Sequence, residues 1–200
     1  MIPARLTLVS ASPRRRELLA RLGLPFDVCP SDAPELDTAD DGRTLAVLNA
    51  ELKVRQSPLV NDPARVLLGA DTLIELDGRF LGKPDGLESA RGMLAVLAGR
   101  THDVITGVCL SGPAVSSDSP FIFVSSAAVS HVTFRALSFV DIQAYLDGGE
   151  WEGKAGAYAI QGEGQSLVSR LEGDFDNVVG LPTSLIHDLL STHYSHCRFL

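Results

Sequence analysis

The chain has 200 residues, of which 45% are hydrophobic, and it carries a formal net charge of −8. This length and apolar fraction are enough to bury one sizeable core, so we expect a single domain spanning residues 1–200. An excess of acidic residues is atypical of general nucleic-acid or anionic-membrane binders, which usually display an excess of Lys and Arg. Basic residues that matter for function are therefore expected to act locally.

The N-terminal sequence has neither the apolar core nor the cleavage site of a signal peptide, and no apolar run reaches the roughly 18 residues that a membrane span needs. We therefore expect a soluble, cytoplasmic protein. Cys29, Cys109 and Cys197 are far apart and form no CxxC or Cys/His cluster. This pattern favours free, packed thiols over a disulfide framework or a structural zinc site.

The first part of the chain predicts a strand followed by two helices. Residues 5–12, "RLTLVSAS", are typical of a short strand that leads into a helix with buried leucines and a stop at Gly23. Residues 30–43 are rich in Pro, Asp and Gly and predict an exposed loop. Residues 44–56 predict the second helix.

The next segment predicts a buried strand, a hairpin and a helix. Residues 64–71 contain a continuous apolar run, as in a strand buried on both faces, and we expect this strand to end at Asp71. An Asp-Gly dipeptide between two short β-like runs predicts a hairpin over residues 72–83. Residues 87–99 predict a helix that a terminal glycine stops.

The second half of the chain predicts more β structure. Residues 102–110 and 121–137 are expected to be antiparallel strands, joined by a Gly/Pro/Ser-rich loop over residues 111–120. Residues 138–149 predict a helix that opens with a capping box. Residues 153–182 alternate short β-like runs with glycines, and the proline that ends this segment is expected to open a last helix. Together these elements predict an α/β (mixed α+β) protein with a mixed sheet.

Two arginines stand at an unusual place in the first predicted helix. Ser12 suits the N-cap and Pro13 the first helical position. Arg14 and Arg15 then lie where the helix dipole is positive, which costs roughly 0.3–1 kcal/mol for each cation. A bound phosphate chain would explain them, because free backbone N–H groups and guanidinium groups both bind phosphate. An exposed basic turn is the alternative.

Asp71 is the second candidate for chemistry. It closes an apolar strand and precedes Thr72, at the kind of strand end that commonly opens onto a ligand crevice. An acid there can hold a divalent metal or take a proton from water. The alternative is a turn-forming Asp that caps the following segment.

Other charged residues carry weaker signals. Lys53 and Lys83 add positive charge, but single lysines are usually solvated surface residues. The segment around Lys83 lacks the GxxxxGK[ST] pattern of a Walker loop. Glu35 and its acidic neighbours are most simply a solvated loop, and the five histidines show neither HExxH nor a triad spacing.

In combination and order, these segments resemble the Maf family of nucleoside triphosphate pyrophosphatases along nearly the whole chain. The resemblance is carried by "LVSASPRRRELLARLGLPF", "GADTLIELDGRFLGKP", "MLAVLAGRTHDVITGV", "VTFRALS", "GKAGAYAIQG" and "NVVGLP". It implies the Maf/inosine-triphosphatase-like fold, in which an elongated, twisted mixed sheet is flanked by helices in two lobes around a central cleft.

The resemblance also implies an activity. Proteins of this family hydrolyse the α–β phosphoanhydride of a nucleoside triphosphate with Mg²⁺ or Mn²⁺, releasing the monophosphate and pyrophosphate, which suits a role in cleaning the nucleotide pool. The segments "ADT" and "AGAYAIQG" resemble the branch that acts on dTTP and UTP rather than on 7-methyl-GTP. A homodimer is also expected of the family, whereas nucleic acid and membrane are not expected partners.

The family's site residues map onto positions of this chain. Asp71 matches the proposed proton acceptor and, with Glu35 at the mouth of the site, is an expected metal ligand. Arg14, Thr72 and Gln161 fall at positions associated with base choice, and the Gln161 amide could pair with a pyrimidine edge. Arg16 matches no fixed position and is expected at the surface. The residues matching those that hold the phosphates are Ser10, Arg14, Arg15, Lys53 and Lys83.

Two other functions compete with this interpretation. The family has also been linked to inhibition of septum formation, so the chain could be a nucleotide-binding regulator of division with little catalysis. A nucleotide kinase or phosphotransferase is a third alternative, but the chain has neither a P-loop nor a second acceptor-site motif.

Overall fold

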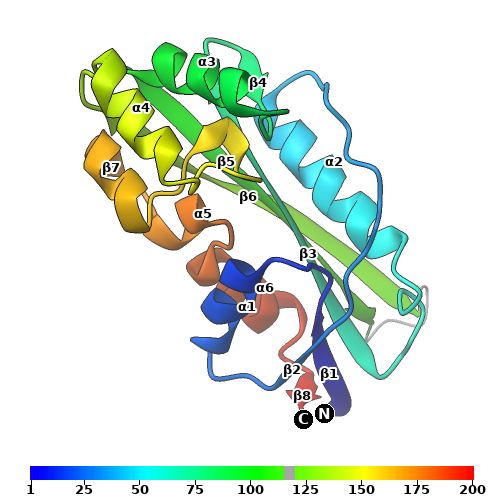
Figure 1. Ribbon diagram of the computed structural model, residues 1–200. Helices are drawn as coiled ribbons and strands as arrows, with labels where there is room; N and C mark the ends of the chain where they lie inside the picture. The colour runs from blue at the N-terminus through cyan, green and yellow to red at the C-terminus, as the bar shows by residue number, and fades with distance from the viewer. Residues whose placement is uncertain (115–119) are drawn as a thin grey trace.

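A mixed sheet organises the computed structural model, which describes residues 1–114 and 120–200 (Figure 1). Within these residues the strand order is β2-β1-β3-β5-β6-β7, with β4 beside β3 and β8 beside β1. The strands are β1 (Ile2–Leu8), β2 (Phe26–Val28), β3 (Arg65–Leu76), β4 (Arg79–Leu81), β5 (Thr101–Pro113), β6 (Phe121–Phe134), β7 (Val168–Glu172) and β8 (Cys197–Phe199). The predicted α/β class and the mixed sheet are confirmed.

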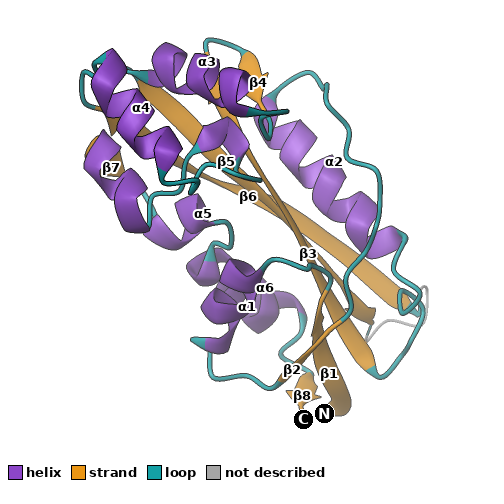
Figure 2. Ribbon diagram, viewed as in Figure 1, coloured by secondary structure: helices purple, strands orange, loops and turns teal. Residues whose placement is uncertain are grey.

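Helices cover both faces of this sheet (Figure 2). They are α1 (Pro13–Ala20), α2 (Gly42–Arg55), α3 (Leu87–Leu97), α4 (Phe139–Asp147), α5 (Phe175–Val179) and α6 (Thr183–His193), with 3₁₀ turns η1 (Ala155–Ala157) and η2 (Gly162–Leu167). The predicted Ser138–Asp141 capping box opens α4. In the part of the chain that the structure describes, no helix has the length and apolarity needed to cross a membrane.

The direction of the strands changes along the sheet. β1 pairs in parallel with β2, β3 and β8, whereas the pairs β3–β5, β5–β6 and β6–β7 are antiparallel. The predicted antiparallel pairing of the two long strands β5 and β6 is confirmed. Half of the predicted loop between them, residues 115–119, lies outside the described residues, and β5 itself extends into the first three positions of that loop.

The hydrophobic core is divided between the two faces of the sheet. The larger cluster joins one face to side chains of α1, α3, α4 and α6. Two smaller clusters lie on the other face under α2, one around Leu67 and Cys109 and one around Leu73 and Ile105. All three cysteines are free thiols, as predicted.

Two glycines allow α2 to approach the sheet closely. A Cβ atom on Gly107 of β5 would lie 2.2 Å from the Ala46 carbonyl group, and one on Gly69 of β3 would lie 2.6 Å from the Ala50 carbonyl oxygen. Real Cβ atoms do not approach other atoms so closely, so any side chain there would push α2 outward. The absence of side chains at these two positions therefore sets the height of α2 above β3.

Two sequence predictions are corrected by this fold. The strand predicted to end at Asp71 continues as β3 to Leu76, because β5 pairs with it on both sides of Asp71. The predicted β-like runs over residues 153–182 are mostly η1, η2 and α5, with β7 as their one strand among the described residues. Positive φ angles at Gly156 and Gly162 turn the backbone out of an extended conformation there. Strands β2 and β8 had no sequence prediction.

We predict that Gly107→Ala lowers the free energy of unfolding by about 1–3 kcal/mol, because the new methyl group overlaps the α2 backbone. Gly92→Ala is the matched control, since nothing lies within 4 Å of that added methyl group and alanine favours a helix interior by roughly 0.5–1 kcal/mol. Urea unfolding measures both. Equal stability of the two variants would contradict the tight approach of α2.

A buried histidine connects β5 to the segment after η1. His102 is 2% exposed, its Nε2 atom lies 2.8 Å from the Tyr158 hydroxyl, and its ring meets that of Phe134 edge to face. Burial lowers the pKa of His102 from 6.5 to about 4, although the charge of Asp103 opposes this. The folded protein therefore holds His102 neutral at pH 5, where an unfolded chain protonates it.

We predict that this difference makes stability fall with acidification. Because the unfolded state takes up the proton first, lowering the pH from 7 to 5 should reduce the free energy of unfolding by about 2 kcal/mol through His102 alone. His102→Gln, which cannot titrate, should lose that part of the pH dependence. Urea unfolding of both proteins at pH 7 and pH 5 makes the comparison, and identical pH dependence would refute the assignment.

Candidate active site

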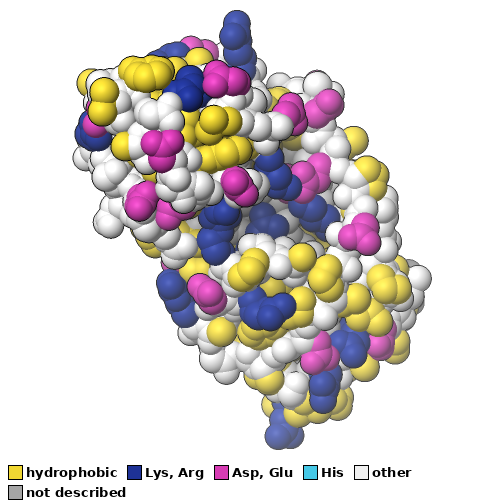
Figure 3. Space-filling view, in the orientation of Figure 1, with side chains coloured by type: hydrophobic (Ala, Val, Ile, Leu, Met, Phe, Trp, Pro, Cys, Tyr) yellow, Lys and Arg dark blue, Asp and Glu magenta, His cyan; other side chains and the backbone are white. Residues whose placement is uncertain are grey.

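A cavity of about 520 Å³ opens beside β3 (Figure 3). β1 pairs with the start of β3 up to Leu68 and β4 with its end from Ile74, so residues 69–73 have no neighbouring strand on that edge in the described chain. The cavity opens at this gap in the strand pairing. Five basic and three acidic residues line it, an excess of two positive charges in a protein of net charge −8. Such a hollow suits an anionic ligand.

All nine site residues predicted from the sequence line this one cavity. They come from the end of β1, from α1 and α2, from β3 and from the loops between elements. The nine are Ser10, Arg14, Arg15, Glu35, Lys53, Asp71, Thr72, Lys83 and Gln161. Their common location supports the residue set, while the role of each remains a prediction.

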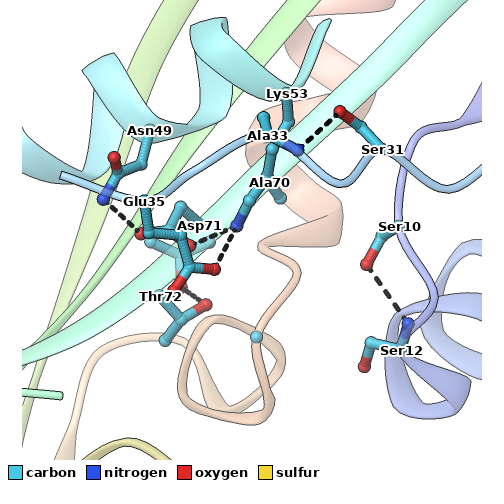
Figure 4. A network of polar contacts seen from close by, with 12 residues as sticks. Ser10, Ser12, Ser31, Ala33, Glu35, Asn49, Lys53, Ala70, Asp71 and Thr72 are labelled. Atoms are coloured by element: carbon cyan, nitrogen blue, oxygen red, sulfur yellow. Dashed lines mark hydrogen bonds and ion pairs between the residues drawn. The ribbon is translucent and has the colours of Figure 1, made fainter. Parts of the chain in front are cut away.

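Asp71 faces α2 and is held by two side chains of that helix (Figure 4). Its Oδ1 atom lies 2.5 Å from Lys53 Nζ, and its Oδ2 atom accepts a hydrogen bond of 3.1 Å from Asn49 Nδ2. Asp71 is 7% exposed. A carboxylate removed from water in this way requires such partners, because an unpaired buried charge is strongly unfavourable.

Glu35 belongs to an irregular segment, residues 30–41, which we term the strap. Its carboxylate accepts from Lys53 Nζ at 2.9 Å and from Lys83 Nζ at 3.3 Å. Burial raises the pKa of Glu35, but the hydrogen bond and charge of Lys53, together with Lys83, lower it to about 2. Glu35 is therefore ionised at neutral pH and links two lysines from different elements.

The guanidinium of Arg15 forms most of its hydrogen bonds with other groups of the protein. Its Nε donates to the Gly180 carbonyl oxygen and its Nη1 to that of Ala70, both at 2.8 Å, and Nη1 also donates to Ser10 Oγ at 3.3 Å. Burial lowers the pKa of this guanidinium, although the charges of Asp71 and Glu35 oppose the effect. Arg15 thus joins α1, β3 and the end of α5, while its charge contributes to the cavity.

Arg14 lines the same cavity but is placed differently from Arg15. It is half-buried, and burial lowers its pKa while the negative charge of Glu150 opposes this. No hydrogen bond to its guanidinium occurs within the described chain, so its donors are free for a ligand. Arg16 is exposed, as predicted.

Two threonine hydroxyl groups connect Arg15 to the Asn177 carbonyl group through hydrogen bonds. Thr106 Oγ1 lies 3.0 Å from the Asn177 carbonyl oxygen, which can only accept, so Thr106 donates to it. Thr72 Oγ1, 3.0 Å from Thr106 Oγ1, must then donate to Thr106, and it accepts from Arg15 Nη2 at 3.1 Å. Thr72 therefore has no hydrogen left to donate to a ligand.

We predict that Thr106→Val lowers the free energy of unfolding by about 1–3 kcal/mol, because the Thr72 hydroxyl and the Asn177 carbonyl group lose their partner in a buried place. Valine has nearly the shape of threonine, so packing is retained. Thr106→Ser keeps the hydroxyl and is the control. If urea unfolding shows Thr106→Val to be as stable as the wild type, the hydroxyl chain contributes nothing.

Sequence reasoning missed other lining residues, among them Asn49 and Lys154. Asn49 comes four residues before Lys53 on α2, and this helical spacing places both side chains on one face. Lys154 precedes η1 and adds a fifth cation to the lining. Its pKa is lowered by burial and by the charge of Arg14.

A cavity with an excess of cations around a buried carboxylate is suited to a phosphorylated small molecule. The sequence model of the family described as Maf-like protein matches residues 5–193. The chain therefore belongs to the Maf family, and the resemblance noted in the sequence is confirmed.

Curated relatives match nearly the full chain. A dTTP/UTP pyrophosphatase of Moorella thermoacetica is 45% identical over 191 residues, which cover 94% of each protein. One of Acholeplasma laidlawii is 42% identical over 186 residues, covering 92% of this chain and 94% of the relative. A third, of Deinococcus radiodurans, is 40% identical and covers 93% and 91%, respectively.

Proposed function

We propose that this protein is a nucleoside triphosphate pyrophosphatase that converts dTTP or UTP to the monophosphate and pyrophosphate. The observation that carries the proposal is the Asp71 carboxylate, set beside Lys53 at 2.5 Å inside a cavity with an excess of positive charge. The names of the curated relatives supply the substrate class. A binding module alone has no need for a buried carboxylate at this point.

The lining residues suit a triphosphate chain. Arg14 has free donors, and Lys53 and Lys83, which line the same cavity, are both held by Glu35. These cations would stabilise the charge that develops on the departing pyrophosphate. Ser10 Oγ accepts from the Ser12 backbone and from Arg15, which leaves its own hydrogen free for a phosphate oxygen.

Asp71 would act as the proton acceptor. A water oxygen forms a bond to the α-phosphorus while the bond from that phosphorus to the bridging oxygen breaks. The electron pair leaves with pyrophosphate, and the water proton passes to the Asp71 carboxylate. Lys53 and Asn49 hold this carboxylate at the cavity wall during the step.

The donor set also suits Mg²⁺ or Mn²⁺. Asp71 and Glu35 both contact Lys53 Nζ, at 2.5 and 2.9 Å, so the two carboxylates lie close together and would hold the ion through lone pairs that Lys53 does not use. Magnesium in nucleotide sites is commonly held by one or two carboxylates together with substrate phosphates. The described residues contain no group of three or more His, Cys, Asp or Glu side chains suited to a metal, so phosphate oxygens would complete the shell. A bound ion would offset phosphate charge.

Base recognition is assigned to Gln161. It lines the cavity near Tyr158 and Ile160, and its amide has no hydrogen-bond partner within the described chain. An amide offers both a donor and an acceptor, which fits the edge of uracil or thymine. Thr72 lies in the same cavity, but its inward hydrogen bond to Thr106 means that it would influence the nucleotide through Arg15.

The reaction is tested with dTTP and UTP in the presence of Mg²⁺ or Mn²⁺, in water enriched in oxygen-18. Attack at the α-phosphorus places the label in the monophosphate and yields unlabelled pyrophosphate. Label in pyrophosphate or release of orthophosphate alone would reject α–β cleavage at this atom. A panel of purine triphosphates tests the base preference.

We predict that Asp71→Asn lowers kcat by about 10²- to 10⁴-fold, because the amide cannot accept the proton from water. Binding of the non-hydrolysable analogue α,β-imido-dUTP should change little, since Arg14 and Lys83 are retained. Arg16→Ala is the control and should keep the wild-type rate, because this side chain is exposed. Near-normal turnover by Asp71→Asn would exclude Asp71 as the base.

A further inference from the structure

We propose that Asn49 is a positioning residue for this reaction, which orients the Asp71 carboxylate and fixes the strap, residues 30–41, beside it. The inference rests on the proposed function. Asn49 lies in α2, four residues before Lys53, and none of the sequence motifs of the site contains it. It acts on the substrate only through Asp71 and the strap.

Every polar group of the Asn49 side chain is used. Its Oδ1 accepts from the Leu36 backbone N–H at 2.7 Å, while Nδ2 donates to the Leu36 carbonyl oxygen and to Asp71 Oδ2, each at 3.1 Å. Asn49 is 3% exposed. Both N–H donors and the oxygen acceptor of this buried amide form hydrogen bonds, so Asn49 connects the strap to Asp71.

The contact completes the environment of Asp71. Lys53 holds Oδ1 and Asn49 holds Oδ2, so two side chains on one face of α2 fix both oxygens and with them the plane of the carboxylate (Figure 4). A general base must present its lone pair to a water in line with the leaving group. A misplacement of about 1 Å can cost as much as 10²-fold in rate.

The same amide determines where the strap lies. Leu36 follows Glu35, whose carboxylate bridges Lys53 and Lys83. By pairing with both backbone groups of Leu36, as a neighbouring strand would, Asn49 fixes the backbone next to Glu35. Asn49 thus holds Asp71 directly and holds Glu35 through the backbone of its neighbour Leu36.

The first test is Asn49→Leu, which retains volume and removes the three hydrogen bonds. We expect kcat for dTTP or UTP to fall about 10- to 100-fold, with the Kd for α,β-imido-dUTP within about 3-fold of the wild type. Leu48→Ala is the matched control, because Leu48 adjoins Asn49 on α2, is 38% exposed and lies outside the cavity lining. It should keep the wild-type kcat.

The second variant, Asn49→Asp, has nearly the same shape and covers the case in which Asn49→Leu does not fold. It keeps an acceptor for the Leu36 N–H but replaces the amide donor with a second carboxylate about 3 Å from Asp71, so the hydrogen bond that orients Asp71 is lost and the two groups repel each other. The charged groups facing this pair are Lys53 from α2, Glu35 from the strap and Arg15 from α1. All three are unchanged in the variant.

We therefore expect Asn49→Asp to lower kcat for dTTP or UTP by at least about 10-fold, as Asn49→Leu does. A purely structural role would lower the stability of both variants and leave the kcat of the folded proteins unchanged. An active wild type with normal kcat in folded Asn49→Leu or Asn49→Asp overturns the role of Asn49 alone. A wild type that releases no pyrophosphate overturns the proposed function and this role with it.

Discussion

The site depends on the close contact of α2 with two glycines of the sheet, one in β3 and one in β5. Gly69 and Gly107 let the helix backbone approach within van der Waals distance of the sheet. Only at this height do Asn49 and Lys53 reach the two oxygens of Asp71. The packing of a helix on a sheet is thus directly responsible for the geometry of a charged cluster.

The alternation of side chains along β3 divides the site into two halves. Asp71 points to the α2 face and joins the cluster with Lys53 and Glu35, whereas Thr72 points to the opposite face and supports Arg15. Because neighbouring residues of a strand face opposite sides, one short segment serves both halves. The gap in the strand pairing at residues 69–73 then opens this segment to a ligand.

Local signals in the sequence predicted local structure well. The Asp-Gly turn of the β3–β4 hairpin has positive φ at Asp77 and Gly78, and the capping box of α4 is present, because both depend on residues a few positions apart. The supposed strand end at Asp71 was wrong because β5, a distant segment, pairs past it. Asn49 was missed because its partners Leu36 and Asp71 are 13 and 22 residues away.

The sequence by itself determined the family, the class of fold and nine of the residues that line the cavity. Only the tertiary structure separated the two adjacent arginines at the start of α1. Arg15 meets acceptors 55 and 165 residues away at Ala70 and Gly180, whereas the donors of Arg14 remain open to the cavity. Hydrogen bonds between distant segments depend on how the sheet brings those segments together. Helix capping and dipole effects act within one turn of a helix, so they cannot predict such bonds.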